Sequence, residues 1–263
     1  MPTYALLGAT GATGSAILRC LLSEKPSELK LNIFIRSKNK LLASFPQLQT
    51  TSPFPINIFE GPITDKTALK SCLEDADVVF VCIATNDSAP GTSIALDIAS
   101  AIVESLETLL QIQISTYKTP TILQLRSTTL NNNINSGVAG YIAHFCLYHV
   151  YADLERACKL YEARAKEVPG LLDHIAVDPP DLHDANSTQR TGYKILTPEQ
   201  QRTEPYPTSL SYADLGAAFC EVARRREEFA GQSAVVTATG KVNKTWGTLI
   251  GYLFRGAKGM VFG

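Results

Sequence analysis

Three glycines near the start of the chain have the spacing of a nucleotide-binding turn. Gly8, Gly11 and Gly14 form a GxxGxxG pattern between an apolar run and an amphipathic segment. A dinucleotide pyrophosphate needs a tight turn, close backbone approach and a helix N-terminus with free N–H groups. The glycines could instead only shape a turn, but their position between a strand and a helix favours binding. We therefore predict that a dinucleotide contacts Gly8, Thr10, Gly11, Ala12, Thr13 and Gly14.

A short polar segment after the second apolar run discriminates between the two nicotinamide cofactors. An acid at this position would bond the ribose 2′-hydroxyl of NAD(H), whereas an arginine accommodates the 2′-phosphate of NADP(H). The chain has Arg36-Ser37-Lys38, with two cations and no acid. These residues could be no more than solvated charges in a loop. We predict that Arg36, Ser37 and Lys38 contact the 2′-phosphate and that the cofactor is NADP(H).

Two further segments follow strands on the cofactor side. Ala84, Thr85 and Asn86 come after the fourth apolar run, where we expect them to line the adenosine and ribose. Asp65 follows the third run, and it could either flank the adenine or cap the next helix.

The elements that must position these residues alternate along the chain. Short runs rich in β-branched residues alternate with stretches of helical period, as in repeated βαβ units. Expected strands are 3–7, 31–35, 56–59, 78–84, 121–125, 174–177 and a short 193–196, and expected helices are 15–23, 94–109, 142–167 and 212–226. The predicted fold is α/β, a doubly wound parallel sheet (Rossmann) with a small C-terminal substrate-binding lobe. We expect one domain, 1–263, with a nucleotide-binding core at about 1–177 and the lobe at about 178–263.

Composition narrows the classes of partner. The 263 residues carry 24 basic and 25 acidic side chains, so no general attraction for nucleic acid or an acidic membrane is expected. Six scattered cysteines indicate reduced, buried thiols, and no apolar run approaches the ~18 residues of a membrane span. We expect a cytoplasmic protein with a small-molecule substrate. An apolar face at the end of the chain could cap the domain or form a homodimer contact, and it comprises Trp246, Leu249, Ile250, Leu253 and Phe254.

The sequence resembles a known superfamily over most of its length. The residues that carry the resemblance are 7–14, Arg36-Ser37, 61–65, 153–157, Asp178-Pro179-Pro180 and 211–215. They are similar to the atypical short-chain dehydrogenase/reductase superfamily and, within it, to NmrA-like and averufin-oxidase-like proteins of fungal secondary metabolism. The resemblance implies an NADP(H)-dependent oxidoreductase acting on an aromatic polyketide or related intermediate.

The same resemblance implies a proton-transfer site that this chain matches only in part. Active members have a Ser or Thr after the fifth strand and a YxxxK unit whose lysine tunes the tyrosine. Ser127, followed by Thr128 and Thr129, matches the first position. No YxxxK occurs near the expected helix, since Phe145, Ala152, Glu155 and Ala165 follow Tyr141, Tyr148, Tyr151 and Tyr161 at the fourth position.

Another group must then exchange the proton. Tyr141, His144, Tyr148 and Tyr151 share one face of one expected helix. Histidine titrates nearest to neutral pH, so our catalytic candidates are His144, then Tyr148, together with Ser127. The alternative is that these aromatics only pack against the sheet.

Three functions remain open at this point. The first is the oxidoreductase. The absence of YxxxK motivates the second, a cyclase or isomerase that holds the same cofactor without net redox change. The third is a non-enzymatic NmrA-like regulator that senses NADP(H). A cluster of His174, Asp178, Asp181, His183 and Asp184 could bind a metal or form a pocket wall, and we expect no metal.

Overall fold

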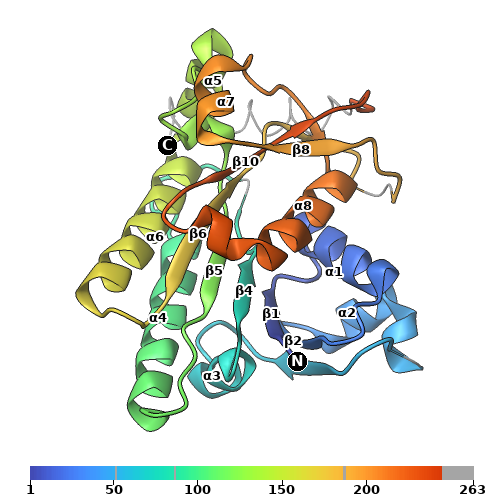
Figure 1. The fold of residues 1–263 in the computed structure, drawn as a ribbon, viewed down its shortest axis with the longest axis vertical. Helices are drawn as coiled ribbons and strands as arrows, with labels where there is room; N and C mark the ends of the chain where they lie inside the picture. Colours follow the sequence, from blue (N-terminus) through green and yellow to red (C-terminus); the bar gives the residue numbers. More distant parts are fainter. Residues whose placement is uncertain (51, 86, 186–187, 245–263) are drawn as a thin grey trace.

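The computed structural model describes residues 1–50, 52–85, 87–185 and 188–244, whose centre is one large sheet (Figure 1). The strand order is β3-β2-β1-β4-β5-β6-β10-β8, with all neighbours parallel except β10 and β8. Its strands are β1 (Thr3–Leu7), β2 (Lys30–Ile35), β3 (Ile56–Glu60), β4 (Val78–Val81), β5 (Thr121–Leu125), β6 (Asp173–Asp178), β8 (Tyr193–Leu196) and β10 (Ala234–Ala238). A small parallel pair joins β7 (Leu182–His183) to β9 (Leu210–Ser211).

Helices cover both faces of the sheet (Figure 1). One face packs against α1 (Ala12–Glu24), α2 (Lys38–Ser44) and α8 (Tyr212–Arg224). The other packs against α3 (Lys66–Leu73), α4 (Ile94–Ile112) and α6 (Tyr148–Glu167). Strands covered on both faces are typically apolar at consecutive positions, as residues 4–7 and Val78–Val81 are, and both strands are buried throughout. The predicted doubly wound fold is confirmed.

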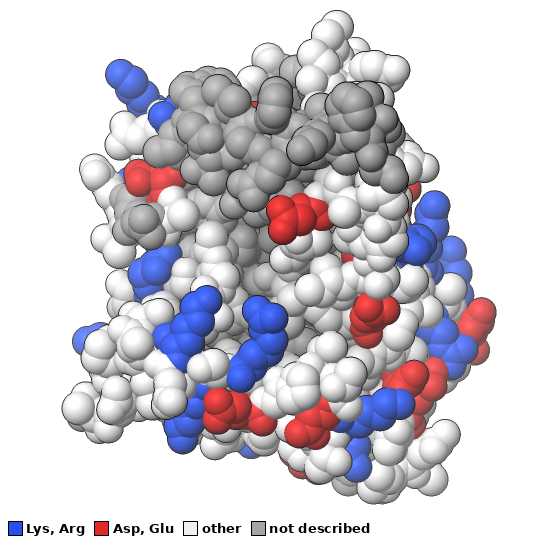
Figure 2. Space-filling view, turned by 180° about the vertical axis from the view of Figure 1, so that it is seen from behind, with Lys and Arg blue, Asp and Glu red and all other residues white. Residues whose placement is uncertain are grey.

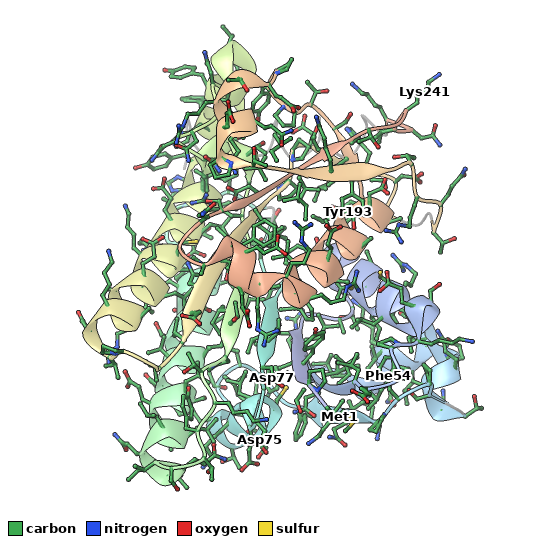
Figure 3. All side chains as sticks on the ribbon, viewed as in Figure 1. Met1, Phe54, Asp75, Asp77, Tyr193 and Lys241 are labelled. Carbon is green, nitrogen blue, oxygen red and sulfur yellow. The ribbon has the colours of Figure 1, made fainter. Side chains whose placement is uncertain are left out.

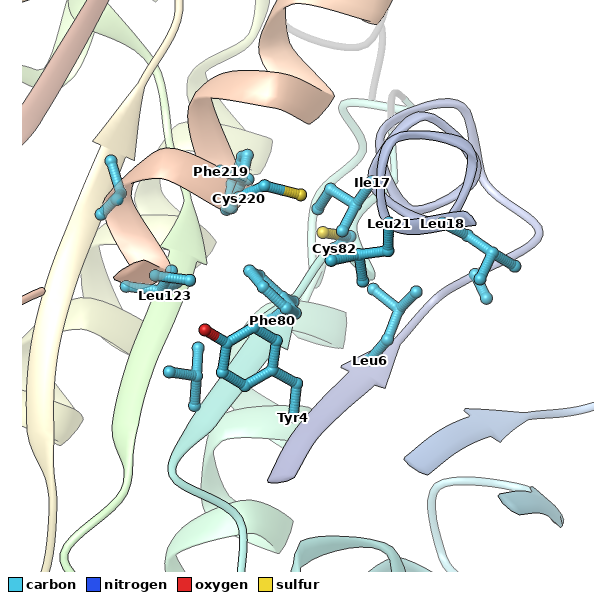
Figure 4. Close-up of a cluster of buried hydrophobic side chains, with 14 of the residues drawn as sticks. Tyr4, Leu6, Ile17, Leu18, Leu21, Phe80, Cys82, Leu123, Phe219 and Cys220 are labelled. Carbon is cyan, nitrogen blue, oxygen red and sulfur yellow. The ribbon is translucent and has the colours of Figure 1, made fainter. Parts of the chain in front are cut away.

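The core on the α1 and α8 face is built around aromatic contacts (Figure 4). The ring centroids of Tyr4 and Phe80 lie 5.6 Å apart in an edge-to-face arrangement, and those of Phe80 and Phe219 lie 6.2 Å apart. Ile17 of α1 belongs to the same buried cluster. Edge-to-face pairs are favourable beyond the area they bury, so these contacts join α8 to β4 and β4 to β1, the strand that precedes the glycine turn.

The two edges of the parallel sheet have different roles. At the amino ends, shown by the labels of Met1, Asp75 and Asp77 in Figure 3, the Asp77 carboxylate accepts the Thr3 N–H at 2.7 Å. At the carboxyl ends, the order of strand addition reverses between β1 and β4. These two strands are parallel neighbours, and β2 and β3 extend the sheet on the other side of β1. Ligands of open α/β sheets bind in the crevice at such a switch point.

One predicted helix is wrong. The segment expected as one helix over 142–167 is divided into α5 (Gly137–Cys146) and α6, and Leu147 between them has non-helical backbone angles of φ −106° and ψ 20°. The buried hydroxyl of Ser88 accepts the His149 N–H at 3.2 Å in the first turn of α6. A side chain from a distant loop therefore satisfies the new helix start, which periodicity cannot reveal.

The residues after 177 add two strands, β8 and β10, to the main sheet. β8 has the expected bounds, whereas β10 and the helix α7 (Pro198–Thr203) were not predicted. Earlier in the chain, the helix α2 was not predicted either. The division of the domain near residue 177 stays a prediction, and the apolar face at 246–254 lies outside the described residues. The described chain also has three 3₁₀ turns, Pro46–Gln49, Thr128–Leu130 and Arg226–Phe229.

The described surface agrees with the near-zero net charge. Basic and acidic side chains are interspersed on the face shown in Figure 2. All six cysteines are free thiols, five of them buried and Cys20 partly exposed. None of the helices in the described part of the chain has the length and apolarity needed to cross a bilayer.

Candidate functional site

The glycine turn has the geometry that a bound pyrophosphate requires. Gly8 has φ +93°, a conformation that side chains rarely adopt, and a Cβ there would lie 3.0 Å from the Cys82 carbonyl oxygen. A Cβ on Gly14 would lie 2.2 Å from the Gly8 carbonyl oxygen, so only glycine lets α1 pack this closely against the turn. Gly11 is the N-cap and the first turn of α1 carries no acidic residue. The free backbone N–H groups at the start of α1 and the dipole of this helix can therefore attract phosphate.

The remaining residues of the predicted loop lie in the same turn. Ala12 and the buried Thr13 begin α1, and the partly exposed Thr10 precedes the N-cap Gly11. The predicted residues thus lie in one continuous segment from the end of β1 to the first turn of α1.

The end of β2 presents cations but also a carboxylate. Arg36 is exposed, and Ser37 is the N-cap of α2, where its hydroxyl accepts the Lys40 N–H at 3.3 Å. The Lys38 N–H donates to the Glu60 carboxylate at 2.8 Å. Glu60, at the end of β3, was not predicted to be part of this site, because no local sequence pattern links it to Lys38. An anion bound here would meet the Arg36 and Lys38 charges with one acid nearby.

The loop after β4 lies beside the glycine turn. The Cys82 backbone contacts Gly8 closely, which brings the beginning of this loop to the crevice. Ala84 is exposed, the partly exposed Thr85 hydroxyl accepts the Asp87 N–H at 3.0 Å, and Asn86 lies outside the described residues. Asp65 caps α3, accepting the Ala68 N–H at 3.0 Å, so the capping interpretation of that residue is confirmed.

A pair of hydroxyl groups meets just beyond the carboxyl end of β5. The Ser127 Oγ and Tyr151 hydroxyl oxygens are 3.4 Å apart, and Ser127 also accepts the Thr129 N–H at 3.3 Å. Burial raises the pKa of Tyr151, and hydrogen bonds from Ser127 and Thr129 oppose that shift. At neutral pH Tyr151 is therefore a protonated phenol beside a serine hydroxyl, an arrangement that can exchange a proton with a substrate oxygen.

A second tyrosine joins this group from a distant loop. The Tyr206 hydroxyl accepts a hydrogen bond from Thr128 at 3.3 Å and lies 3.2 Å from the Thr129 hydroxyl. Tyr206 lies between α7 and β9, and no sequence signal marked it.

The other two catalytic candidates lie at the surface of the described chain. His144 and Tyr148 are both exposed, and the break at Leu147 puts them on different helices. The His144 ring centroid is 5.9 Å from that of Tyr151 and 6.1 Å from that of Tyr148. The structure thus brings Ser127 together with Tyr151, which was considered only as part of the expected helix face, and leaves the roles of His144 and Tyr148 as predictions.

A buried ion pair supports the Ser127 loop. Arg126 donates twice to the Asp178 carboxylate, at 2.8 and 2.6 Å, and Asn131 donates to the same carboxylate at 2.8 Å. Asp178 is fully buried, and its contact with Arg126 raises the arginine pKa. The Thr128 N–H also bonds the Pro179 carbonyl at 3.0 Å. The cluster considered above for metal binding thus contributes Asp178 to an ion pair.

These features define a Rossmann-type dinucleotide-binding protein with a hydroxyl pair just beyond the carboxyl end of β5. Residues 8–226 match the model of a family described as NAD(P)H-binding. The chain is 52% identical to averufin oxidase A of Dothistroma septosporum strain NZE10 over 98% of this chain and 92% of the relative. It is 46% identical to averufin oxidase stcO of Emericella nidulans over 98% of this chain and 90% of the relative.

Solved structures share the fold at low sequence identity. A short-chain dehydrogenase/reductase from Veillonella parvula superposes with a TM-score of 0.65 at 15% identity, covering 91% of this chain and 95% of that one. A short-chain dehydrogenase from Sphingobium yanoikuyae, solved with NADPH, has a TM-score of 0.57 at 15% identity, covering 89% and 87%. The chain belongs to the NAD(P)H-binding family and is an oxidoreductase similar to the averufin oxidases. Among the three functions considered from the sequence, this similarity supports the oxidoreductase.

Proposed function

We propose that this protein transfers hydride between NADP(H) and averufin or a closely related aromatic polyketide. The substrate class comes from relatives named averufin oxidase that match nearly the whole chain. The contact between Ser127 Oγ and the Tyr151 hydroxyl at 3.4 Å carries the catalytic part, because both groups can bond one substrate oxygen. When bound, the nicotinamide supplies or accepts the hydride, while the protein orients the substrate and moves the proton.

Tyr151 is the proton-exchanging group in this proposal and Ser127 the orienting one. A protonated phenol can donate to an oxygen that gains charge as hydride arrives. The Thr129 N–H holds one lone pair of Ser127 Oγ, which leaves the serine O–H free to turn toward Tyr151 or the substrate. Neither step needs Tyr151 to be ionised beforehand.

We also propose NADP(H) rather than NAD(H). Arg36, Lys38 and Lys40 are exposed cations beside the end of β2, where they outweigh the nearby carboxylate of Glu60. A guanidinium can bond a phosphate with two parallel N–H groups, an interaction that a ribose hydroxyl cannot match.

The reaction is tested with the purified protein, averufin and each nicotinamide cofactor, following nicotinamide absorbance and product mass. We expect NADP(H)-dependent conversion of averufin. Tyr151→Phe should lower kcat by about 10²–10⁴ with an unchanged Kd for NADPH, because it removes proton transfer and leaves the glycine turn intact.

Tyr141→Phe is the matched control, since this side chain is 75% exposed on α5. Conversion without any change in the nicotinamide would contradict the redox assignment. If Tyr151→Phe keeps full turnover while His144→Gln or Tyr148→Phe loses it, the proton is exchanged at the surface pair and not at Tyr151.

A further inference from the structure

The exposed aromatic side chains of the described chain gather at one place. Of the Phe, Tyr and Trp residues that the structure describes, the exposed ones are Tyr141, Phe145 and Tyr148. Tyr141 and Phe145 are one helical turn apart on α5, and Tyr148 begins α6, which lies below α5 in Figure 1. Val138 and Ile142 add exposed aliphatic groups to α5. Exposed apolar patches of this kind mark places where a ligand or a partner binds.

Ring contacts connect this patch with the proposed catalytic pair. The His144 ring centroid lies 5.9 Å from that of Tyr151 and 6.1 Å from that of Tyr148. Tyr151 is buried, with its hydroxyl 3.4 Å from Ser127 Oγ, whereas the other two rings belong to exposed residues. A ligand that reaches the hydroxyl pair with one oxygen therefore has exposed aromatic surface next to its remaining atoms.

The first turn of α6 holds the Tyr148 ring in place. The buried Ser88 hydroxyl accepts the His149 N–H at 3.2 Å. Val150 is buried in the core on the α4 side of the sheet, and Leu147 packs against the same core. The backbone on both sides of Tyr148 is therefore anchored, while 46% of this residue stays exposed. A ring on a fixed backbone loses little conformational freedom when a ligand stacks on it.

The segment that carries these rings has no charged side chain. Residues 127–152, which include Ser127, Tyr151 and all of α5, contain no Asp, Glu, Lys or Arg. An uncharged apolar ligand can bind against this segment without desolvating a charge. Ligand sites combine aromatic lining with a few placed polar groups, and here the hydroxyls of Ser127 and Tyr151 are such groups. This chemistry fits a flat, fused-ring aromatic molecule that carries oxygen substituents.

We propose that His144 and Tyr148 form an aromatic wall that stacks against the fused rings of the substrate and sets its reacting oxygen at the catalytic hydroxyl pair. The wall rests on the proposed function, because it places the same class of substrate at the same pair. His144 and Tyr148 contact the substrate through their rings and exchange no proton, in contrast to the catalytic role predicted for them from the sequence.

The test separates the rings from their titratable groups in the purified protein. His144→Ala and Tyr148→Ala remove the rings, whereas His144→Phe and Tyr148→Phe keep a ring and remove the titratable group. We expect each alanine variant to raise the Kd and KM for averufin about threefold to tenfold, as for loss of one aromatic contact, with a smaller change in kcat. Each phenylalanine variant should restore Kd and KM toward the wild-type values. Calorimetric titration of the cofactor-free protein measures Kd, and initial rates with NADP(H) measure KM and kcat.

Ile114→Ala is the matched control, because it shortens an 82% exposed apolar side chain that follows the end of α4. This variant should keep the wild-type Kd, KM and kcat. The Kd for NADPH should not change in either alanine variant, since the glycine turn is left intact.

The measurements distinguish failure of the wall from failure of the proposed function. If the wild type binds averufin without converting it and the alanine variants bind it more weakly, the proposed function is wrong and the wall stands. If the wild type converts averufin and the alanine variants keep its Kd and KM, only the wall is wrong. If the wild type neither binds nor converts averufin, both proposals fail.

Two further results would assign the patch another role. If the phenylalanine variants lose kcat as strongly as the alanine variants, His144 and Tyr148 exchange the proton and the wall is wrong. If sedimentation shows a wild-type dimer that the alanine variants dissociate, with the Kd for averufin unchanged, the patch joins two copies of the chain and the wall is wrong as well.

Discussion

At the scale of single residues, the predicted cofactor site depends on charged side chains and on glycines, which have no side chain. Gly14 is required because any Cβ would collide with the Gly8 carbonyl. Arg36, in contrast, is an exposed cation at the end of β2. The first residue shapes the binding surface, and the second supplies the interaction that would distinguish two cofactors differing by one phosphate.

Replacing Arg36 tests that distinction. Arg36→Asp should weaken NADPH binding by about tenfold to hundredfold, since a charge-assisted hydrogen bond contributes roughly 1.5–3 kcal/mol, and should leave NADH binding equal or tighter. Fluorescence titration with both cofactors measures the ratio of the two dissociation constants. Lys118→Asp, the same change of charge at an exposed site before β5, is the control. A ratio that does not move would show that Arg36 is only a solvated charge.

At the scale of elements, two contacts fix the geometry on either side of the crevice. α8 approaches α1 so closely that a Cβ on Gly216 would lie 2.5 Å from the Ala16 carbonyl carbon. On the other side, the Asp153 carboxylate accepts the Ala95 and Leu96 N–H groups at 2.7 and 3.2 Å, which attaches α6 to the beginning of α4. The helix that carries Tyr151 is thereby held in register with the strands.

The buried pair of Arg126 and Asp178 gives a prediction at this scale, because it joins the ends of β5 and β6. Asp178→Asn should destabilise the protein by about 3–5 kcal/mol, since it leaves a largely buried guanidinium without its counter-charge. Urea denaturation measures the change. Glu104→Gln, which breaks the exposed pair of Lys66 and Glu104, should cost less than about 1 kcal/mol. Equal effects of the two substitutions would show that burial of the Asp178 pair has no energetic consequence.

At the scale of the whole molecule, stability should depend on pH through His174, a partly exposed histidine whose Nε2 atom is buried. Burial and the nearby Arg126 charge lower the pKa of His174 to about 4, and its Nε2 has no hydrogen-bond partner in the described structure. The His174 ring also stacks on Tyr161, with centroids 5.3 Å apart. The folded protein therefore holds the neutral imidazole, whereas the unfolded chain takes up a proton below its usual pKa of about 6.5.

The sign of this effect follows from the lowered pKa. The stability associated with His174 is present above about pH 6.5 and is lost as the pH falls toward about 4, by up to about 3 kcal/mol. Across this pH interval, the free energy of unfolding measured by urea denaturation should fall less for the His174→Gln variant than for the wild type. His144→Gln, at an exposed position, should follow the wild type. Parallel curves for all three proteins would contradict the buried neutral state of His174.

The local parts of this protein could be derived from its sequence because they depend on neighbouring residues. The bounds of β1, β5 and β8 agree with the predictions to the residue. Strand periodicity, the glycine turn and the cationic end of β2 each lie within a few consecutive positions, where spacing reports the backbone directly. The doubly wound class followed from the alternation of strands and helices.

Only the tertiary structure decided which hydroxyl groups meet. Ser127 and Tyr151 are 24 residues apart, and Thr129 and Tyr206 are 77 apart. The break at Leu147 depends on Ser88, and the sheet gained β10 from a segment that was not expected to form a strand. Such contacts join loops, helices and strands that are distant in the sequence, and residue spacing alone contains no measure of that packing. The glycine turn could be recognised from its own residues, whereas the partner of Ser127 was determined by the fold.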